Sequence, residues 1–467
     1  MTFKERNQNQ PLLLPPSFRD VLGEGHEAVI LDEFMRELDT KALEQSYNNE
    51  HGGSSAYHPA MLLSVLIYGY MNGIFSSRKI AKHLSQDLAF MYLAGAAKPD
   101  FRTLARFRRE KGQYLETIMA GVVGKAKDLG LVSFGTCSLD GTKIKANASK
   151  DKYVRKDDLE KNIKKMLTEA GRIDEAEDGL YGDKEDAKDP ALKTKAGRDR
   201  RKKELAQMRK KEEGKLVKLG DREAANLTDP DAKLMKMKQG AGFANAYNIQ
   251  SVTENGIILS SSIFTTSADQ GALVPAMEDF KAAHGTLPEK LLADKGYSSE
   301  DNYAFCEHAQ IDAYIPPYQE ATDLSGFRYD PRHDTYTDTH GRAYVFKQHV
   351  DRKDASLRIG RPRSVEAKRR SHHLYRRALY VHCDRRTGKK KYLQISPQWQ
   401  TYVERQKKKL SSAAGKLLYK RRMYDVEGAF ANIKKNLGFT AFNLRGLAGV
   451  TAEWILVSLV HNLKKVM

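Results

Sequence analysis

The stretch GTCSLDGTKI, residues 135–144, marks the point where the chain changes from a helical to an extended pattern. Residues 136–140 and 142–144 predict a strand, a turn and a second strand, with the turn at Asp140 and Gly141. Before this stretch, from Glu27 to about Leu129, apolar residues recur at helical spacing and no strand-like alternation is present. We therefore expect a helical unit followed by a sheet.

Further along the chain, strands and helices alternate. The stretch AYNIQSVTENGIILSSSIFTT (246–266) contains two alternating strands joined by Asn255 and Gly256, which supply the positive φ angles of a tight hairpin. A helix over about 269–283, a buried strand in PEKLLADKGY, a helix over about 299–309 and a short strand in IDAYIP follow. This order predicts an α/β fold in which helices flank a mixed sheet.

Two segments interrupt the predicted sheet. Residues 150 to about 218 are densely charged and carry apolar residues at helical spacing, which predicts a helical hairpin with a polar loop around Gly182. Residues 316 to about 406 are polar, basic and irregular, with one hairpin in HDTYTDTHGRAYVF and a flexible basic patch in RPRSVEAKRR. Two helices, over about 416–436 and 447–465, close the chain. The expected units are an all-α N-terminal domain over 1–130 and a sheet domain over 131–467, with insertions at 150–235 and 316–410.

Composition limits the classes of function. The chain has 79 Lys and Arg against 60 Asp and Glu, a formal charge of +19, so its surface attracts polyanions such as DNA, RNA or anionic membranes. The three cysteines are far apart, which argues against a disulfide framework or a zinc knuckle. Because the sequence shows no signal peptide and no apolar stretch of about 18 residues, we expect a soluble, unexported protein with no membrane partner.

Within the helical unit, two short helices resemble a helix-turn-helix. Ser76 or Ser77 could cap the first helix, and Asp100 the second. The second helix carries Arg106 and Arg109, which suit either DNA contact or an ordinary solvated face. The pattern leaves both interpretations open.

Three acidic residues stand where polar residues are unexpected. Asp140 and Asp294 end strands, and Glu427 lies beside the apolar stripe of a helix. Each alone has an ordinary explanation, as a turn former or a solvated helix residue. Together they form an all-oxygen ligand set for hard divalent cations, and two such ions can clamp a phosphodiester. Lys434 follows Glu427 by two helical turns, so the two should share a face about 10 Å apart.

Three motifs, SLDGTKIKANAS, LLADKGYSSEDN and YKRRMYDVEGAFANIKKNLGF, resemble those of bacterial insertion-sequence transposases of the DDE class with a Tyr-Arg-Glu-Lys signature. With flanking segments such as PDFRTLARFRREK and FNLRGLAGVTAEWILVSLVHNL, the resemblance covers nearly the whole chain. It implies a ribonuclease-H-like core with insertions, preceded by a helical domain that grips the transposon ends. Its implied metal ligands and catalytic residues are Asp140, Asp294 and Glu427. Its implied phosphate contacts are Tyr419, Arg422 and Lys434. Arg445, in the last flanking segment, is a further expected DNA contact.

The chain departs from the family pattern in two places. The signature usually places an arginine four residues before the glutamate, but Met423 stands there, so Arg422 or Arg421 must serve from one register earlier. Some relatives carry a cysteine cluster in the insertion before the last helices. Here only Cys383 remains, and we predict no structural zinc.

The resemblance implies an enzyme of DNA transposition that cleaves DNA and transfers strands with Mg²⁺, two ions being expected and Mn²⁺ able to substitute. The implied partners are the double-stranded DNA of the transposon ends and target, and a second copy in a synaptic homodimer; no organic cofactor is implied. The implied location is the bacterial cytoplasm, at the nucleoid when DNA is bound. A structure-selective nuclease and a non-catalytic DNA-binding derivative remain alternatives, the latter ranked lower because all three acidic residues are present.

Overall fold

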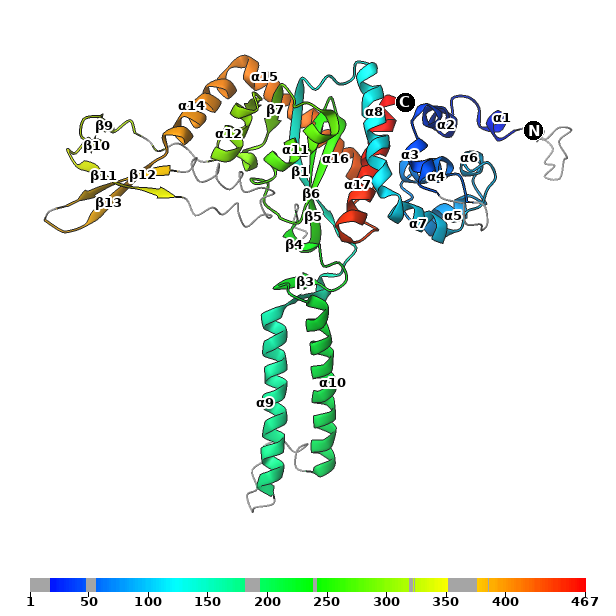
Figure 1. The fold of residues 1–467 in the computed structure, drawn as a ribbon, viewed down its shortest axis with the longest axis horizontal. Coiled ribbons are helices and arrows are strands. Elements are labelled where there is room, and N and C mark those ends of the chain that lie inside the picture. The colour runs from blue at the N-terminus through cyan, green and yellow to red at the C-terminus, as the bar shows by residue number, and fades with distance from the viewer. Residues whose placement is uncertain are drawn as a thin grey trace, which may run out of the picture.

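The computed structural model describes residues 17–47, 56–180, 194–237, 242–318, 322, 324–351, 376–384 and 386–467. A central sheet is surrounded by helices, with the N-terminal helices on one side (Figure 1). A long helical hairpin and a small second sheet extend from this body in different directions (Figure 1).

The N-terminal part is helical, as predicted. Its α-helices are α1 (Phe18–Leu22), α2 (Glu27–Glu37), α3 (Lys41–Gln45), α4 (Pro59–Met71), α5 (Ser77–His83), α6 (Leu88–Leu93), α7 (Phe101–Glu110) and α8 (Leu115–Asp128). Ser76 directly precedes α5. The Asp100 carboxylate accepts a hydrogen bond from the Thr103 backbone N–H at 2.7 Å and so caps α7. The two short helices thus begin where the sequence predicts.

The central sheet is mixed. Its strands are β1 (Thr136–Lys145), β4 (Lys233–Lys236), β5 (Phe243–Glu254), β6 (Ile257–Phe264), β7 (Lys290–Ala293) and β8 (Asp312–Tyr314). The order is β4-β5-β1-β7-β8, and β6 also pairs with β5. β1 runs antiparallel to β5 and parallel to β7, and β7 runs parallel to β8. Helices α11 (Leu273–His284) and α12 (Glu300–His308) follow β6 and β7, which gives the mixed α/β arrangement expected of a ribonuclease-H-like fold.

The prediction of a turn at Asp140 and Gly141 is wrong. β1 continues without a break, and in the antiparallel register Asp140 lies opposite Ser251 and Gly141 opposite Gln250. The long partner strand β5 supplies backbone partners on both sides of Gly141, so the extended conformation is favoured over a local turn. The hairpin between β5 and β6 is confirmed, with φ of +51° at Asn255 and +74° at Gly256.

The first insertion is the predicted helical hairpin. Helices α9 (Lys156–Leu180) and α10 (Lys195–Leu219) lie side by side and project from the sheet (Figure 1). At their base, β2 (Tyr153–Arg155) pairs with β3 (Ala224–Asn226). The loop around Gly182 lies outside the described residues.

The second insertion is more regular than predicted. It holds a five-stranded antiparallel sheet of β9 (Phe327–Asp330), β10 (Thr335–Asp338), β11 (Ala343–Asp351), β12 (Arg376–Cys383) and β13 (Lys390–Ile395). Aromatic and aliphatic side chains on these strands form a small cluster of their own, separate from the main core. This packing stabilises strands whose basic residues hide the alternating pattern. The predicted hairpin corresponds to β10 and β11, and the basic patch RPRSVEAKRR lies outside the described residues.

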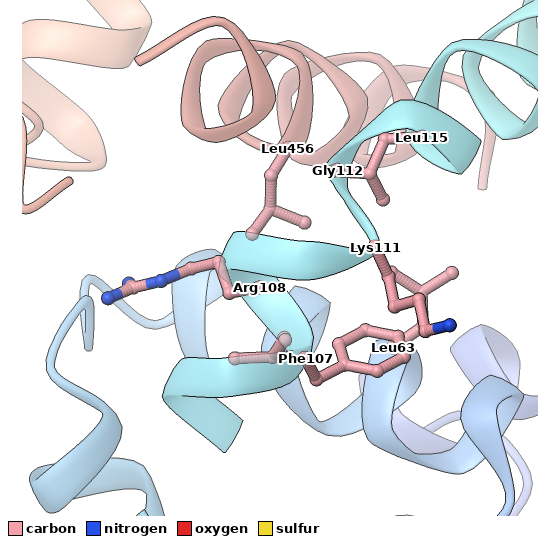
Figure 2. Close-up of a pocket in the computed structure, with 8 residues that line it drawn as sticks. Leu63, Phe107, Arg108, Lys111, Gly112, Leu115 and Leu456 are labelled. Atoms are coloured by element: carbon pink, nitrogen blue, oxygen red, sulfur yellow. The ribbon is translucent and has the colours of Figure 1, made fainter. Parts of the chain in front are cut away.

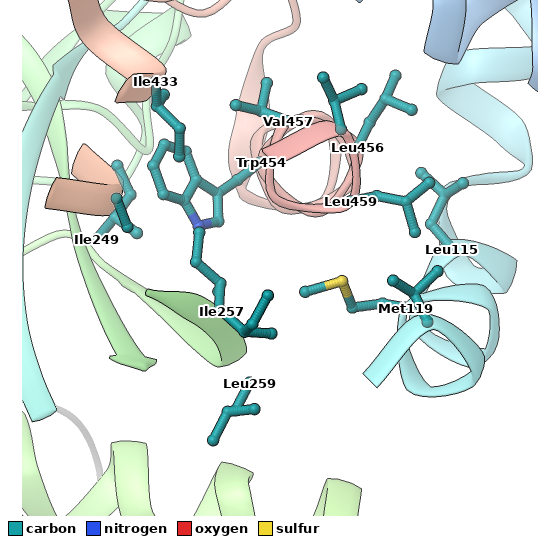
Figure 3. Packing of buried hydrophobic residues seen from close by; sticks show 14 of the residues in the cluster. Leu115, Met119, Ile249, Ile257, Leu259, Ile433, Trp454, Leu456, Val457 and Leu459 are labelled. Atoms are coloured by element: carbon teal, nitrogen blue, oxygen red, sulfur yellow. The ribbon is translucent and has the colours of Figure 1, made fainter. Parts of the chain in front are cut away.

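The last helices complete the core. α14 (Pro397–Ser411) leads into α15 (Ala413–Arg422), which continues through two π-helical segments (Met423–Glu427 and Asn432–Asn436) that flank α16 (Gly428–Ala431). α17 (Gly446–Val466) then crosses the middle of the molecule. Figure 3 shows Trp454, Leu456 and Leu459 of α17 among side chains of β5, β6 and α8. A single hydrophobic cluster therefore includes the N-terminal helices, the sheet and α17.

The sequence expectation that no segment has the length and apolarity of a membrane span needs correction. Of the described helices, α17 is long and apolar enough to cross a membrane. In the structure, 67% of its most apolar 18-residue window is buried inside the protein. Such burial is typical of a core helix, whose apolar character is explained by packing on all sides.

Candidate active site

Two neighbouring parallel strands bring Asp140 and Asp294 together. Leu139 of β1 is paired with Ala293 of β7, and each aspartate is the next residue along its strand. The Asp140 carboxylate accepts from the Gly141 N–H at 2.8 Å, and the Asp294 carboxylate accepts from the Gly296 N–H at 2.6 Å. These backbone contacts orient both carboxylates, that of Asp140 within β1 and that of Asp294 directly after β7.

Glu427 reaches the same region through an arginine. The Arg422 Nη2 atom lies 3.0 Å from the Glu427 Oε1 atom, and its Nη1 atom lies 3.3 Å from the Asp140 Oδ2 atom. The side chains of Asp140 and Arg422 are each only 14% exposed, whereas that of Glu427 is 47% exposed. One guanidinium thus bridges two of the three predicted catalytic carboxylates.

The π-helical segment explains why the arginine stands one register early. Arg422 precedes Glu427 by five residues, and a π turn places residues five apart on the same face, as an α turn does for residues four apart. Met423 is 59% exposed. Arg421 points elsewhere, because its Nη2 atom donates to the Asn255 side chain at 2.9 Å. Of the two candidate arginines, Arg422 is therefore the one beside the carboxylates.

Tyr419 and Lys434 flank this group. The Tyr419 ring centroid lies 5.9 Å from the Arg422 guanidinium carbon, and burial raises the pKa of the tyrosine hydroxyl. The Lys434 ammonium donates to the Lys143 carbonyl at 3.3 Å, further along β1. Burial alone would lower the pKa of Arg422, but the neighbouring acidic residues, Asp140 foremost, outweigh it and raise that pKa. Arg422 therefore stays a cation in this setting.

The other predicted DNA contacts lie outside this cluster. Arg106 and Arg109 are exposed on α7, where Arg109 pairs with Glu110 at 3.1 Å. Arg108, between them, is buried: its Nη1 atom donates to the Tyr70 hydroxyl at 2.6 Å and lies 3.5 Å from Glu453. Arg445, just before α17, donates to the Asn147 carbonyl at 3.0 Å.

A small pocket beside α7 has no catalytic character. It lies where α4, α7, α8 and α17 meet, and Figure 2 shows Phe107, Leu115 and Leu456 among its lining residues. Its volume of about 10 Å³ is only enough for about one water molecule. We treat it as a packing defect between helices.

The sequence analysis missed four residues beside the aspartates. The Asp269 Oδ1 atom accepts from the Asn248 side chain at 2.9 Å and from the Gln250 side chain at 2.7 Å. The Tyr297 hydroxyl in turn donates to the Gln250 side chain. The sequence does indicate two of these residues. Asn248 and Gln250 are polar residues two apart on a buried strand, so they share one face of the sheet.

The chemistry of the site fits a hard divalent cation. Asp140, Asp294 and Glu427 provide only oxygen donors, the ligand type that Mg²⁺ and Mn²⁺ prefer. Asp140 and Glu427 already reach one shared cationic group, Arg422. In the described part of the chain, however, no three acidic, histidine or cysteine side chains form a ready-made metal site.

Two segments of the chain match known protein families. Residues 16–110 match the family described as transposase domain (DUF772), and residues 378–467 match the family described as transposase DDE domain. No curated protein matches the chain. The two family matches support a DDE-type transposase. Glu427 lies within the second matched segment, whereas Asp140 and Asp294 lie outside both.

Proposed function

We propose that this protein is a DDE transposase that binds the ends of an insertion sequence and catalyses metal-dependent DNA cleavage and strand transfer. The observation that carries the proposal is the placement of Asp140 and Asp294 on adjacent parallel strands, with Arg422 paired to both Asp140 and Glu427. The match to a DDE domain around Glu427 supports the same reaction. We also propose that the protein belongs to the subgroup of DDE transposases with the Tyr-Arg-Glu-Lys signature.

Asp140, Asp294 and Glu427 would hold Mg²⁺, with two ions proposed and Mn²⁺ as a substitute. When bound, the metal would activate water or a 3′-hydroxyl and stabilise the leaving oxygen at the scissile phosphate. The protein's own contribution is to hold the three carboxylates on two strands and one helix. We propose no organic cofactor.

Arg422 has an unused donor that suits a DNA phosphate. Its Nη1 atom is buried and makes no hydrogen bond of good geometry, although it lies 3.3 Å from Asp140. We propose that a phosphate oxygen beside the cleaved bond accepts from this group, with Tyr419 and Lys434 as neighbouring contacts.

The remaining DNA contacts would be distributed over the molecule. Arg106 and Arg109 on α7 suit the transposon end, in keeping with a DNA-binding domain over 1–130, and Arg445 suits DNA near the end of β1. The formal charge of +19 predicts affinity that falls steeply with salt. We further propose a homodimer in the synaptic complex, with transposon ends and target as double-stranded DNA, at the bacterial nucleoid.

The test is cleavage and strand transfer on DNA that carries the ends flanking the gene, with Mg²⁺. Asp140→Asn, Asp294→Asn and Glu427→Gln should each lower both rates by at least about 10³-fold, because each removes a metal ligand. End binding in EDTA should stay within about threefold of wild type. The matched control is Asp279→Asn on α11, whose carboxylate is bound to Ser262 rather than to the site, and it should keep activity.

The two alternatives predict different outcomes of this experiment. A structure-selective nuclease would cut branched DNA in a metal-dependent way and join nothing. A non-catalytic derivative would bind the ends without cutting them, and the three variants would then behave like wild type. Retained cleavage in all three variants would contradict the assigned ligands.

A further inference from the structure

Asp269 lies close to two glycines that neighbour the proposed catalytic aspartates, Gly141 within β1 and Gly296 in the turn after β7. It precedes α11, and its side chain is held by two neutral amides, those of Asn248 and Gln250 on β5. A Cβ atom placed on Gly141, next to Asp140, would lie 2.9 Å from the Asp269 Oδ1 atom. A Cβ atom placed on Gly296, two residues after Asp294, would lie 3.8 Å from the Asp269 Cβ atom.

The surroundings of Gly141 and Gly296 leave little space for a side chain. At Gly141, any side chain would also collide with the Gln250 amide that holds Asp269. At Gly296, a side chain would come within 2.8 Å of the Asp294 Oδ1 atom. Neither glycine has a positive φ angle, so the constraint is one of space: Gln250 and Asp269 limit it at Gly141, and Asp294 limits it at Gly296, where Asp269 is in ordinary contact.

The negative charge of Asp269 is not balanced by a partner cation. Its hydrogen-bond donors are uncharged, and no cationic side chain in the described ranges forms an ion pair with it. Burial raises the pKa of the Tyr297 hydroxyl, Asp269, Asp140 and Asp294 raise it further, in that order, and Arg422 lowers it. Three carboxylates thus act on one buried phenol.

We propose that Asp269 is a positioning residue of the catalytic centre, whose uncompensated charge and fixed place beside Gly141 and Gly296 strengthen divalent-cation binding by Asp140 and Asp294. This inference rests on the proposed function. Asp140, Asp269 and Asp294 do not form a ready-made cluster of three metal ligands in the described structure. Asp269 therefore acts through its electric field and through its contacts beside Gly141 and Gly296. A nearby charge of this kind acts strongly on a divalent ion because the interaction scales with the product of charges.

The test is Mn²⁺ titration of the full-length, DNA-free protein, followed by electron paramagnetic resonance of free Mn²⁺. Asp269→Asn removes the charge but keeps an oxygen that can accept from both amides, so it should fold. We expect its Mn²⁺ affinity to fall on the order of tenfold, as for loss of about 1.4 kcal/mol of attraction. Asp269→Glu, which keeps the charge, should stay within about threefold of wild type, and Asp279→Asn should match wild type.

Two further measurements separate this role from a purely structural one. The melting temperature of Asp269→Asn without metal should stay within a few degrees of wild type, and its cleavage rate should recover at higher Mn²⁺ concentration. Equal Mn²⁺ affinity in wild type and Asp269→Asn would overturn the proposal, as would an equal loss in Asp269→Asn and Asp269→Glu.

The variants Asp140→Asn and Asp294→Asn distinguish failure of this proposal from failure of the proposed function. If they abolish Mn²⁺ binding while Asp269→Asn leaves it unchanged, only the role of Asp269 falls. If they bind Mn²⁺ as wild type does, the metal site itself is elsewhere and both proposals fall.

Discussion

Arg422 takes its place between Asp140 and Glu427 because one extra residue is accommodated in a π turn. The guanidinium lies 3.0 Å from Glu427 and 3.3 Å from Asp140, and it is largely shielded from solvent. In this position it neutralises two carboxylates that a metal would also need. Competition between the guanidinium and a divalent cation follows from simple charge balance.

Replacing Arg422 by glutamine should therefore change metal binding before DNA is present. We expect Arg422→Gln to bind Mn²⁺ roughly tenfold more tightly than wild type in the DNA-free state, because one unit of competing positive charge is gone. Its affinity for end DNA should fall, because the proposed phosphate contact of Arg422 is lost. Arg421→Gln is the matched control, since Arg421 contacts Asn255 instead of the carboxylates. Unchanged Mn²⁺ affinity in Arg422→Gln would show that the guanidinium does not compete with the metal.

Among the elements, α17 determines how closely the N-terminal helices approach the core. Gly112, between α7 and α8, faces α17 so closely that a Cβ atom would collide with the Cβ atom of Ala452 (Figure 2 shows Gly112 beside α17). The φ angle of Gly112 is not positive, so the need for glycine is one of space. Small residues at this crossing allow the two segments to touch.

Gly112→Ala should destabilise the protein by about 1–3 kcal/mol through overpacking at this contact. Adding Ala452→Gly to that variant should recover part of the lost stability. The recovery is smaller by about 1 kcal/mol, because a glycine inside a helix is itself destabilising. The free energies of unfolding in urea of the wild type, the two single variants and the double variant together form a double-mutant cycle. Additive effects of the two substitutions would mean that the residues do not press on each other.

At the scale of the whole molecule, buried polar groups connect segments that are far apart in the chain. Glu453 of α17 accepts from the Tyr70 hydroxyl of α4 at 2.8 Å and from the Asn443 backbone N–H at 2.8 Å. His461, also on α17, lies 2.8 Å from the Gly256 carbonyl and 2.9 Å from the Asn432 amide. A carbonyl can only accept, so the ring donates through Nε2 and accepts through Nδ1 as a neutral histidine.

His461 should make folding stability depend on pH. Burial lowers its pKa below the ordinary value of about 6.5, so the unfolded chain binds the proton more readily. The folding stability that neutral His461 contributes is present above a pH of about 6.5 and is lost as the pH falls below that value. His284, whose pKa burial also lowers, adds to the same trend. Melting temperatures from pH 7.5 to 5.5 should fall less steeply for His461→Gln than for wild type, and equal slopes would contradict this role.

Local sequence determined the elements whose patterns are short-range. The helical character before residue 130, the turn at Asn255 and Gly256, the cap at Asp100 and the charged hairpin at α9 and α10 follow from spacing and backbone preferences. Asp140 and Asp294 could be singled out because each directly follows an apolar, strand-like stretch, although Asp140 lies within β1 and not at its end. Their placement side by side agrees with the parallel pairing of β1 and β7.

Only the tertiary structure decided the features that depend on distant partners. β1 is continuous at Gly141 because β5, more than a hundred residues later, supplies its hydrogen bonds. The five strands of the second insertion are stabilised by packing against one another across a long separation in sequence. Arg422 faces Glu427 because a π turn shifts the helix register. Asp269 reaches Gly141 and Gly296 because the sheet brings together three segments whose local patterns carry no information about one another.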